Sequence, residues 1–258
     1  MNARRIGNAF SGPFFQPLWK RLHRLALHRM NYGRGVLTND SGEDWVLRYL
    51  ARGYDPVRPF VAFDAGANTG AYTELVLAAF GDMAQVYCFE PNEATCVLLS
   101  SRYRMADCVH CYNVGLSDRE ETLPLYSDGQ RPFLASHYRR PGVPAASAGQ
   151  VRCTTVDRFC EAEGIDAIDL LKMDVEGHEL KVLQGASGMI ESGRIGHIQF
   201  EFGDCNIDSR TFFRDFFELL APRYRIHRIV RRGLAPIDRY DEAWEIFKGT
   251  NYLAALRA

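Results

Sequence analysis

The sequence lacks a long hydrophobic run and carries almost no net charge. No apolar stretch reaches the roughly 20 residues that a membrane-spanning helix requires. The net charge of −1 gives no overall attraction to nucleic acid or to an anionic membrane, so neither partner is expected for the chain as a whole. A signal peptide is not expected either, because basic residues interrupt the early apolar stretch: Lys20, Arg21, His23 and Arg24.

Cysteine is present, but not in a regular framework. The seven cysteines are scattered along the chain, and an odd number without regular spacing is typical of reduced thiols in a cytoplasmic protein. Cys108 and Cys111 form a single C-x-x-C without a second pair or a nearby histidine pair, so the sequence indicates no zinc site. We therefore expect a cytoplasmic location and no bound metal.

The most informative stretch is a glycine corner. An apolar, strand-like run at residues 61–64 ends on Asp64, and Gly66 and Gly70 bracket a turn before the helix-like residues 71–80. Glycine lets a ligand approach the bare backbone, and the start of a helix offers unpaired N–H groups. The pattern predicts a ligand-binding corner between a strand and a helix.

This corner departs from the known phosphate-binding patterns. Ala65 and Ala67 occupy the positions of the first two glycines of Gly-x-Gly-x-x-Gly, and no lysine of a P-loop follows. An acid such as Asp64 is a poor neighbour for pyrophosphate but a good acceptor for an ammonium group, directly or through water. The residues therefore favour a ligand with an amino group at this end.

A second acid stands at the end of the next strand-like run. Glu90 closes the apolar residues 85–90 and is followed by Pro91. Ligands of open α/β sheets bind outside the carboxyl ends of the strands, where an acid on the second strand can accept hydrogen bonds from both hydroxyls of a ribose. A ribose with an amino-acid tail and no phosphate is S-adenosylmethionine. The alternative is that Asp64 caps the helix and Glu90 is a solvated turn residue.

Strand and helix patterns alternate from residue 60 onward, which predicts an α/β fold with a mostly parallel sheet. The expected strands are 61–64, 86–90, 109–114, 151–156, 168–174, 195–202, 224–230 and 251–256. The last two are expected to form an antiparallel pair, with 234–246 as an insertion between them. The expected helices are 71–80, 92–103, 157–164, a stretch from 178 to about 190, and 211–220.

The sequence predicts an N-terminal helical extension, 1–55, that precedes a core domain, 56–258. Residues 1–30 hold six Lys and Arg residues and no acid, while Leu18, Leu22 and Leu25 recur at helical spacing. Such a basic amphipathic helix can pack on its own domain, on a second copy of the chain in a homo-oligomer, or on a membrane. Asp40 or Ser41 can cap a second helix.

Residues 117–150 depart from the alternation. This stretch holds four prolines and a polar set, Arg131, His137, Tyr138, Arg139 and Arg140. A long connection without periodicity inside a compact domain is usually a lid, a binding loop or a disordered excursion. A lid over the strand ends would exclude water, and His137 could act there as a base.

Further polar residues gather at the ends of two later strands. Asp174, Glu176 and His178 surround Gly177, and they could handle protons, hold a divalent metal ion or cap the following helix. Glu201 lies between two phenylalanines, where an unpaired acid is costly, so it should bind a ligand or pair with an arginine of the lid.

The sequence resembles the FkbM-type family of S-adenosylmethionine-dependent methyltransferases. The resemblance covers roughly residues 60–205 and rests on Phe-Asp-Ala-Gly-Ala-Asn-Thr-Gly-Ala-Tyr-Thr at 63–73, Cys-Phe-Glu-Pro-Asn at 88–92, Asn-Val-Gly-Leu-Ser-Asp at 113–118 and Leu-Leu-Lys-Met-Asp-Val-Glu-Gly-His-Glu-Leu-Lys-Val-Leu-Gln-Gly-Ala at 170–186. It implies a Rossmann-like class I fold, with a mostly parallel seven-stranded sheet and helices on both faces.

The resemblance also implies site residues and an activity. The cofactor-binding set would be Asp64, Gly66, Ala67, Asn68, Gly70, Glu90, Pro91, Asn113, Gly115 and Asp174. The implied reaction is O-methylation of a hydroxyl on a sugar, glycan or natural product. Some base must accept the hydroxyl proton, and the candidates are Asp174, Glu176, His178, Glu201 and His137, directly or through a magnesium ion. A nicotinamide-dependent oxidoreductase and a non-catalytic partner protein that binds the cofactor or a glycan remain as alternatives.

Overall fold

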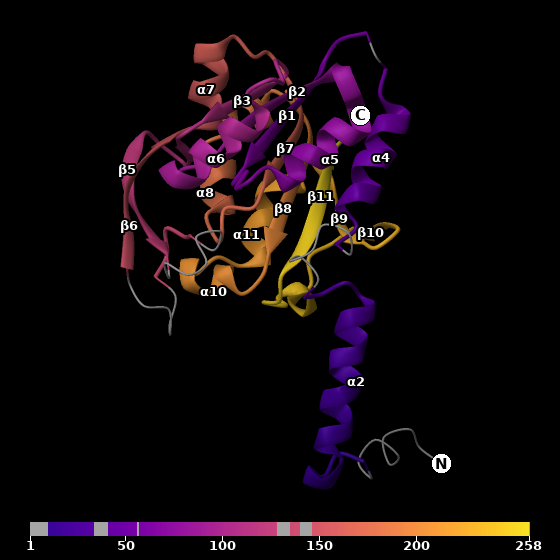
Figure 1. Cartoon of the computed structure of the whole chain (residues 1–258). Helices are drawn as coiled ribbons and strands as arrows, with labels where there is room; N and C mark the ends of the chain where they lie inside the picture. Colours follow the sequence, from indigo (N-terminus) through magenta and orange to yellow (C-terminus); the bar gives the residue numbers. More distant parts are fainter. Residues whose placement is uncertain (1–9, 34–40, 56, 128–134, 140–145, 258) are drawn as a thin grey trace.

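A twisted sheet of eight strands forms the centre of the computed structural model, which describes residues 10–33, 41–55, 57–127, 135–139 and 146–257 (Figure 1). The strand order is β10-β9-β11-β8-β7-β1-β2-β3. The strands are β1 (Phe60–Ala65), β2 (Ala84–Phe89), β3 (Val109–Tyr112), β7 (Ile168–Met173), β8 (Ile195–Phe202), β9 (Tyr224–Val230), β10 (Gly233–Ile237) and β11 (Thr250–Leu256).

The predicted α/β class and Rossmann-like arrangement are confirmed. Strands β3, β2, β1, β7 and β8 run parallel, and β11 lies antiparallel between β8 and β9, as expected for the final pair of strands. The sheet has eight strands rather than seven, because β10 pairs with β9 within the segment expected to be an insertion. The short connection at residues 231–232 closes this hairpin, which extends the edge of the sheet.

Helices cover both faces of the sheet, and the two-residue period of the strands assigns each side chain to one face. Ala62 packs into a core cluster with helices α4 (Glu43–Gly53), α5 (Ala71–Phe80) and α6 (Glu93–Tyr103). Phe63, its neighbour, packs into the opposite cluster with α7 (Val156–Glu163), α8 (Glu179–Gln184), α9 (Ser187–Glu191) and α11 (Phe213–Leu220). The single helix expected from 178 to about 190 is thus two, and α10 (Cys205–Ser209) was not expected.

A second, smaller sheet lies within the segment expected to be a lid. Its order is β4-β6-β5, with β4 (Gly115–Leu116), β5 (Glu121–Ser127) and β6 (Ala146–Thr154). The strand expected at 151–156 therefore belongs to this sheet and not to the edge of the main one. The alternation of apolar and polar residues at 151–156 correctly predicted a strand, but such a pattern does not indicate which sheet the strand joins. Arg131, Arg140 and Asp40 lie outside the described residues.

The N-terminal helix α2 (Gln16–Arg29) projects away from the domain, and none of its residues is buried (Figure 1). Packing against its own domain, one of the alternatives expected from the sequence, is therefore not its arrangement. The chain returns to the domain directly after the helix, at Tyr32, which is 1% exposed. No helix in the described ranges combines the length and the hydropathy needed to cross a bilayer.

Candidate functional site

A cavity opens at the carboxyl ends of β1, β2 and β7. The region contains about 720 Å³ of space not filled by atoms, open solvent included. The expected site residues among its lining are Gly66, Asn68, Glu90, Pro91, Gly115, His137, Asp174 and Glu176. Residues from the first two strand ends, the 174–176 loop and the 117–150 segment therefore line one cavity.

Gly66 allows the loops after β1 and β7 to touch. Its φ is +76°, and a Cβ at this position would lie 1.9 Å from the carbonyl oxygen of Asp174. Only glycine combines this backbone conformation with that contact. The backbone N–H of Asp174 in turn donates to the carbonyl of Ala65, at 3.0 Å. The glycine corner therefore holds Asp174 beside the end of β1.

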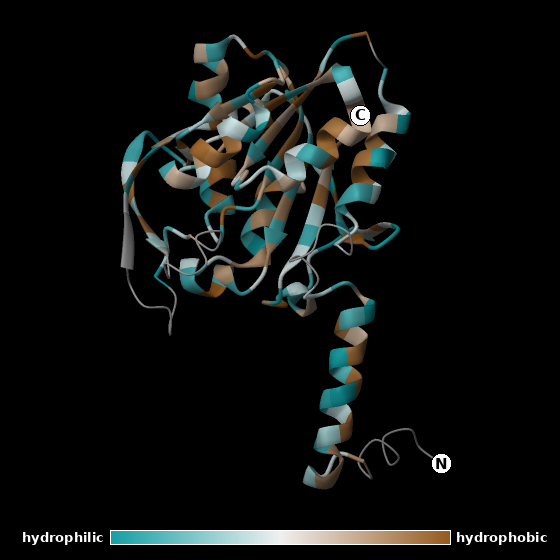
Figure 2. Cartoon of the chain, viewed as in Figure 1, coloured by the Kyte–Doolittle hydropathy of each residue, from teal (hydrophilic) through white to brown (hydrophobic). Residues whose placement is uncertain are grey.

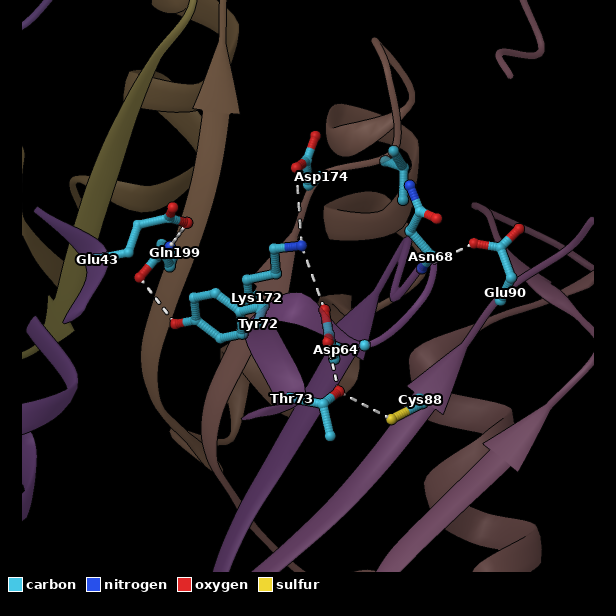
Figure 3. Close-up of polar contacts among 12 residues, drawn as sticks. Glu43, Asp64, Asn68, Tyr72, Thr73, Cys88, Glu90, Lys172, Asp174 and Gln199 are labelled. Atoms are coloured by element: carbon cyan, nitrogen blue, oxygen red, sulfur yellow. Dashed lines mark hydrogen bonds and ion pairs between the residues drawn. The ribbon is translucent and has the colours of Figure 1, made fainter. Parts of the chain in front are cut away.

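Glu90 is fixed by the corner that follows β1. Its Oε2 accepts the backbone N–H of Asn68 at 2.9 Å (Figure 3). Its Oε1 accepts the backbone N–H of Asn92 at 2.8 Å. The side chain is 8% exposed, and burial raises the pKa of its carboxyl. Each carboxylate oxygen can accept more than one hydrogen bond, so both retain acceptor capacity toward the cavity. This arrangement fits the two hydroxyls of a ribose.

Asp64 does not line the cavity, which corrects the expectation that it contacts the ligand directly. The side chain is 1% exposed; its Oδ1 lies 3.2 Å from the Nζ of Lys172, and its Oδ2 accepts the Thr73 hydroxyl at 2.8 Å. The alternation of β1 turns Asp64 toward α5, below the strand end. Its partners are therefore internal, and it contributes through Lys172.

Lys172 is a buried cation that the sequence analysis did not single out. Its Nζ also lies 3.8 Å from an Asp174 carboxylate oxygen and 5.1 Å from the centre of the Tyr72 ring (Figure 3). Burial alone would lower the pKa of this amine, but the neighbouring carboxylates, those of Asp64, Asp174 and Glu43, outweigh burial and raise it. Lys172 therefore stays charged and connects the base of the site to Asp174.

The polar row beneath the site continues across the sheet to α4. Lys172 is paired in register with Asp64 on one side and with Gln199 on the other. Gln199 accepts the Tyr72 hydroxyl at 3.0 Å and donates to Glu43 at 2.8 Å. Burial raises the pKa of Glu43 to about 7. In the sequence, this row was indicated by Asp64 and by a charged residue, Lys172, within the mostly apolar strand at 168–173.

Glu201 pairs with a carboxylate rather than with an arginine. Burial is the main cause that raises the pKa of Glu201 well above its ordinary value, and the neighbouring carboxylates, chiefly that of Asp174 with which it shares a hydrogen bond, add to this effect. No arginine in the described part of 117–150 forms an ion pair with it. These causes disfavour the charged form of Glu201, and the residue, a candidate base from the sequence, is not among those that line the cavity.

Glu179 shapes the loop that carries Glu176. Its Oε1 accepts the backbone N–H groups of Val175 and Gly177, at 2.9 and 3.2 Å. This contact supports a backbone in which Glu176 takes the left-handed conformation, with φ of 55°, which is uncommon for a residue other than glycine. Glu179 is 2% exposed, and burial raises the pKa of its carboxyl to about 8.

Glu179→Gln is expected to flatten the pH dependence of stability. Between the ordinary pKa of 4.5 and the folded value of about 8, the folded chain keeps a proton that the unfolded chain has released. The free energy of unfolding therefore falls as pH rises through this window, by on the order of 1 kcal/mol per pH unit for this group. Glutamine keeps the acceptor oxygen and cannot ionise.

Urea unfolding at about pH 5 and about pH 7.5 tests this expectation, since both values lie within the window in which the slope applies. Glu191→Gln, at an exposed position in α9, is the control and should follow the native chain. An equal loss of stability in the native chain and in Glu179→Gln between the two pH values would contradict the assignment.

His178 is held by two partners outside the cavity lining. Its Nε2 lies 3.0 Å from the Ser117 hydroxyl, and its Nδ1 lies 3.1 Å from the Tyr138 hydroxyl. Ser117 donates its own proton to Glu121, so Nε2–H donates to Ser117, and Nδ1 accepts from Tyr138. Burial lowers the pKa of His178 to about 3. The ring therefore positions the 135–139 segment, and the structure does not support its direct role as the base.

His137 is the histidine that lines the cavity. Its Nδ1 lies 2.9 Å from the carbonyl oxygen of Pro124, and because a carbonyl only accepts, Nδ1 carries the proton. Burial lowers the pKa of this imidazole from 6.5, so the ring is neutral at pH 7. Nε2 is consequently the nitrogen with the lone pair, as a general base requires.

The remaining expected residues have structural partners. Ala67 is 3% exposed within the core, and Gly70 has φ of +86° with Tyr103 2.5 Å from where its Cβ would lie. The Asn113 side chain donates to the carbonyls of Glu90 and Pro91 and lines an adjoining hollow. Across the described ranges, no three His, Cys, Asp or Glu side chains are arranged to hold a metal ion.

Residues 64–225 match the family described as the methyltransferase FkbM domain, which is more than half of the chain. The chain belongs to the FkbM methyltransferase family. It is a methyltransferase, and members of this family take the methyl group from S-adenosylmethionine. The match includes every strand end that contributes to the cavity.

Two relatives of this FkbM methyltransferase are similar to it in sequence. It is 24% identical to 2-O-methyltransferase NoeI of Sinorhizobium fredii, over 67% of this chain and 76% of the relative. It is 29% identical to hexuronic acid methyltransferase AglP of Haloferax volcanii, over 58% of this chain and 59% of the relative. Among solved structures it is similar to the FkbM methyltransferase of Methylobacillus flagellatus, with 16% identity, a TM-score of 0.48 and coverage of 76% of this chain and 43% of that one.

Proposed function

We propose that this FkbM methyltransferase transfers a methyl group from S-adenosylmethionine to a hydroxyl group of a sugar. The observation that carries the proposal is the placement of Glu90 and Asp174, which follow the strands on either side of β1 and line one cavity. Glu90 presents acceptors suited to ribose hydroxyls, and Asp174 lies beside the glycine corner. The domain responsible would be residues 56–258, with 1–55 as an extension.

The donor is assigned to the side of the cavity that Glu90 and Asn68 line. Glu90 would bind the ribose hydroxyls, the backbone around Gly66 and Asn68 would lie along the methionine portion, and Asn113 would border the adenine. Asp174 would face the ammonium group, in place of Asp64, since its carboxylate is exposed enough to meet a ligand and lies next to the corner. Lys172, whose Nζ lies 3.8 Å from an Asp174 carboxylate oxygen, would orient this side chain.

The acceptor hydroxyl needs a base because it is a weak nucleophile at neutral pH. S-adenosylmethionine, when bound, supplies a methyl group that is carried by a positively charged sulfur. The sulfur leaves with the electrons of the carbon–sulfur bond as the acceptor oxygen bonds to the methyl carbon. We assign the base to Nε2 of His137, which takes the hydroxyl proton. The small sheet, through Leu125, and the neighbouring Ala135 cover this side of the cavity and exclude water.

A sugar is the acceptor that the relatives favour. The name of NoeI specifies 2-O-methylation, and that of AglP specifies a hexuronic acid. The chain spans about three fifths of the length of AglP, so the acceptor of the present protein is inferred by likeness of the shared domain. Release of S-adenosylhomocysteine on a panel of hexuronic acids and neutral sugars would identify the preferred substrate.

Glu90→Ala is expected to weaken the binding of S-adenosylhomocysteine about 10- to 100-fold, because two hydrogen bonds to a charged group are lost. Isothermal titration calorimetry measures this directly. Glu161→Ala, which removes an acid from an exposed position in α7, is the control and should leave the affinity unchanged. A melting temperature measured for each variant separates lost contacts from a disturbed corner.

An unchanged affinity in Glu90→Ala would remove the ribose assignment. Native protein that binds S-adenosylhomocysteine but consumes no methyl donor with any sugar would instead contradict the proposed acceptor. The two results therefore test the donor and the acceptor halves of the proposal separately.

A further inference from the structure

Helix α2 exposes large apolar side chains that the domain does not cover. Leu18, Trp19, Leu22 and Leu25 are between 44% and 53% exposed. Phe14, in the turn before the helix, is 87% exposed. Single exposed apolar residues are ordinary on a protein surface, but five within one short segment are expected to be covered by a partner.

The helix carries most of its apolar residues on one face and most of its basic residues on the opposite face, with Arg29 on the apolar side and Leu27 on the basic side as the exceptions. At 100° per residue, the apolar strip comprises Leu18, Trp19, Leu22, Leu25 and Ala26. The opposite face carries Lys20, Arg21, Arg24 and His28. Figure 2 shows both kinds of residue alternating along the helix. An apolar face with Trp and Leu and a polar face rich in Lys and Arg are typical of helices that lie in a membrane interface.

Charge is strongly segregated along the chain. Seven of the 31 Lys and Arg residues precede Asp40, which is the first of the 32 acidic residues. The remaining 24 basic residues leave the chain from Asp40 onward with a net charge of −8. An anionic surface would attract the N-terminal segment and repel the rest, so the helix would meet that surface while the domain stays away from it.

The base of the helix is tied to the domain directly after α2. The Arg228 guanidinium donates to the Tyr32 hydroxyl at 2.9 Å and lies 4.8 Å from the centre of its ring. The Asn31 side chain donates to the carbonyls of Ser41 and Ile229. The residues directly after the C-terminal end of α2 are therefore fixed to the domain, while the helix itself remains exposed.

We propose that α2 is an interfacial anchor that binds the surface of a membrane rich in anionic phospholipid. The apolar strip would enter the region between the headgroups and the acyl chains, and Lys20, Arg21 and Arg24 would meet the lipid phosphates. The helix lies along the membrane and does not cross it. This inference rests on the exposed helix alone and is independent of the proposed reaction.

A second copy of the chain fits the helix less well than a membrane does. The exposed large apolar residues of the described part of the domain are distributed over several elements: Tyr49, Val57, Val97, Leu98, Met105, Ile207 and Phe212. They offer no strip to match that of α2. Pairing two α2 helices would bring together segments in which no acid balances the cations.

Flotation of the full-length protein with lipid vesicles tests the proposal. Binding is expected with vesicles of phosphatidylcholine containing about 30% phosphatidylglycerol and should be weak with phosphatidylcholine alone, because the basic face contributes on anionic lipid only. The triple variant Lys20→Gln, Arg21→Gln and Arg24→Gln should bind the anionic vesicles about 100-fold less tightly, at about fivefold per basic residue. The matched control, Arg52→Gln, Arg104→Gln and Arg239→Gln, changes exposed arginines of the domain and should bind like the native chain.

A second variant tests the apolar strip. Leu18→Ser, Leu22→Ser and Leu25→Ser together should also abolish flotation, while the melting temperature of the domain stays the same because none of these residues is buried. Equal binding of the native chain to both vesicle types, or no binding to either, would overturn the proposal. A mass of two chains by light scattering without lipid, reduced to one chain by the serine variant, would assign the strip to a second copy instead.

Discussion

Lys172→Met is expected to lower the free energy of unfolding by about 3–5 kcal/mol, because removing one partner of a buried ion pair leaves the other charge uncompensated. Lys172 is 5% exposed and lies 3.2 Å from Asp64, which is itself 1% exposed. Methionine fills a similar volume, so the loss reports the missing charge rather than a cavity. Urea unfolding at constant pH measures the change.

The control for this substitution is an ion pair at the surface. Arg58→Met breaks the pair with Asp169, in which the arginine side chain is 52% exposed, and should cost at most about 1 kcal/mol. Adding Asp64→Asn to Lys172→Met should recover at least half of the lost stability, since the buried negative charge is then removed as well. A loss no larger than that of Arg58→Met would show that Lys172 does not neutralise this cluster.

Lys172→Met should also affect the cavity that Asp174 lines. Lys172 lies 3.8 Å from Asp174, whose carboxylate lines the cavity and shares a hydrogen bond with Glu201. Without the cation, the neighbouring carboxylates of Asp174 and Glu201 would lack the positive charge that lies 3.8 Å from Asp174 in the native chain. We expect weaker binding of S-adenosylhomocysteine in Lys172→Met even under conditions in which the variant remains folded.

The positions of Glu90 and Asp174 could be predicted from the sequence because they follow from a general rule. Parallel strands in one sheet end at the same edge, so acids at successive strand ends meet there whatever the details of packing. Asp64 belongs to the same pattern, but in the register of the sheet it lies level with Cys88 and Lys172, two residues before Glu90 and Asp174, and its side chain contacts Thr73 of α5. A shift of two residues along the strand thus separates a residue that lines the cavity from one that supports it.

The buried polar row could not be predicted, because its members are far apart in the sequence. Gln199 bonds Glu43 and Tyr72, each more than 100 residues away in the sequence, and nothing local to Glu43 distinguishes it from a helix-capping acid. The same holds for the small sheet. The alternation at 151–156 was visible, but its partner β5 lies in a segment whose prolines and glycines suggested no regular structure. Pairing between distant segments is a property of the whole fold.

His137→Asn is expected to lower kcat about 10²- to 10⁴-fold, the usual contribution of a general base. Asparagine can still donate to the carbonyl of Pro124 through its side-chain amide, in the position of Nδ1, so the 135–139 segment should stay in place. Affinity for S-adenosylhomocysteine should be nearly unchanged, because the donor is assigned to the side of the cavity that Glu90 lines. Turnover on the preferred sugar and calorimetry measure the two quantities.

The pH dependence of kcat distinguishes His137 from Asp174 as the base. Burial keeps the pKa of His137 below 6.5, so kcat of the native enzyme should rise with pH up to about that value and then stay level, since the unprotonated ring is the active form. The His137→Asn variant should lose this rise together with its rate. If the variant retained most of the native kcat and the same rise, proton transfer would have to be assigned to Asp174, the other cavity-lining candidate whose carboxylate is held by a cation.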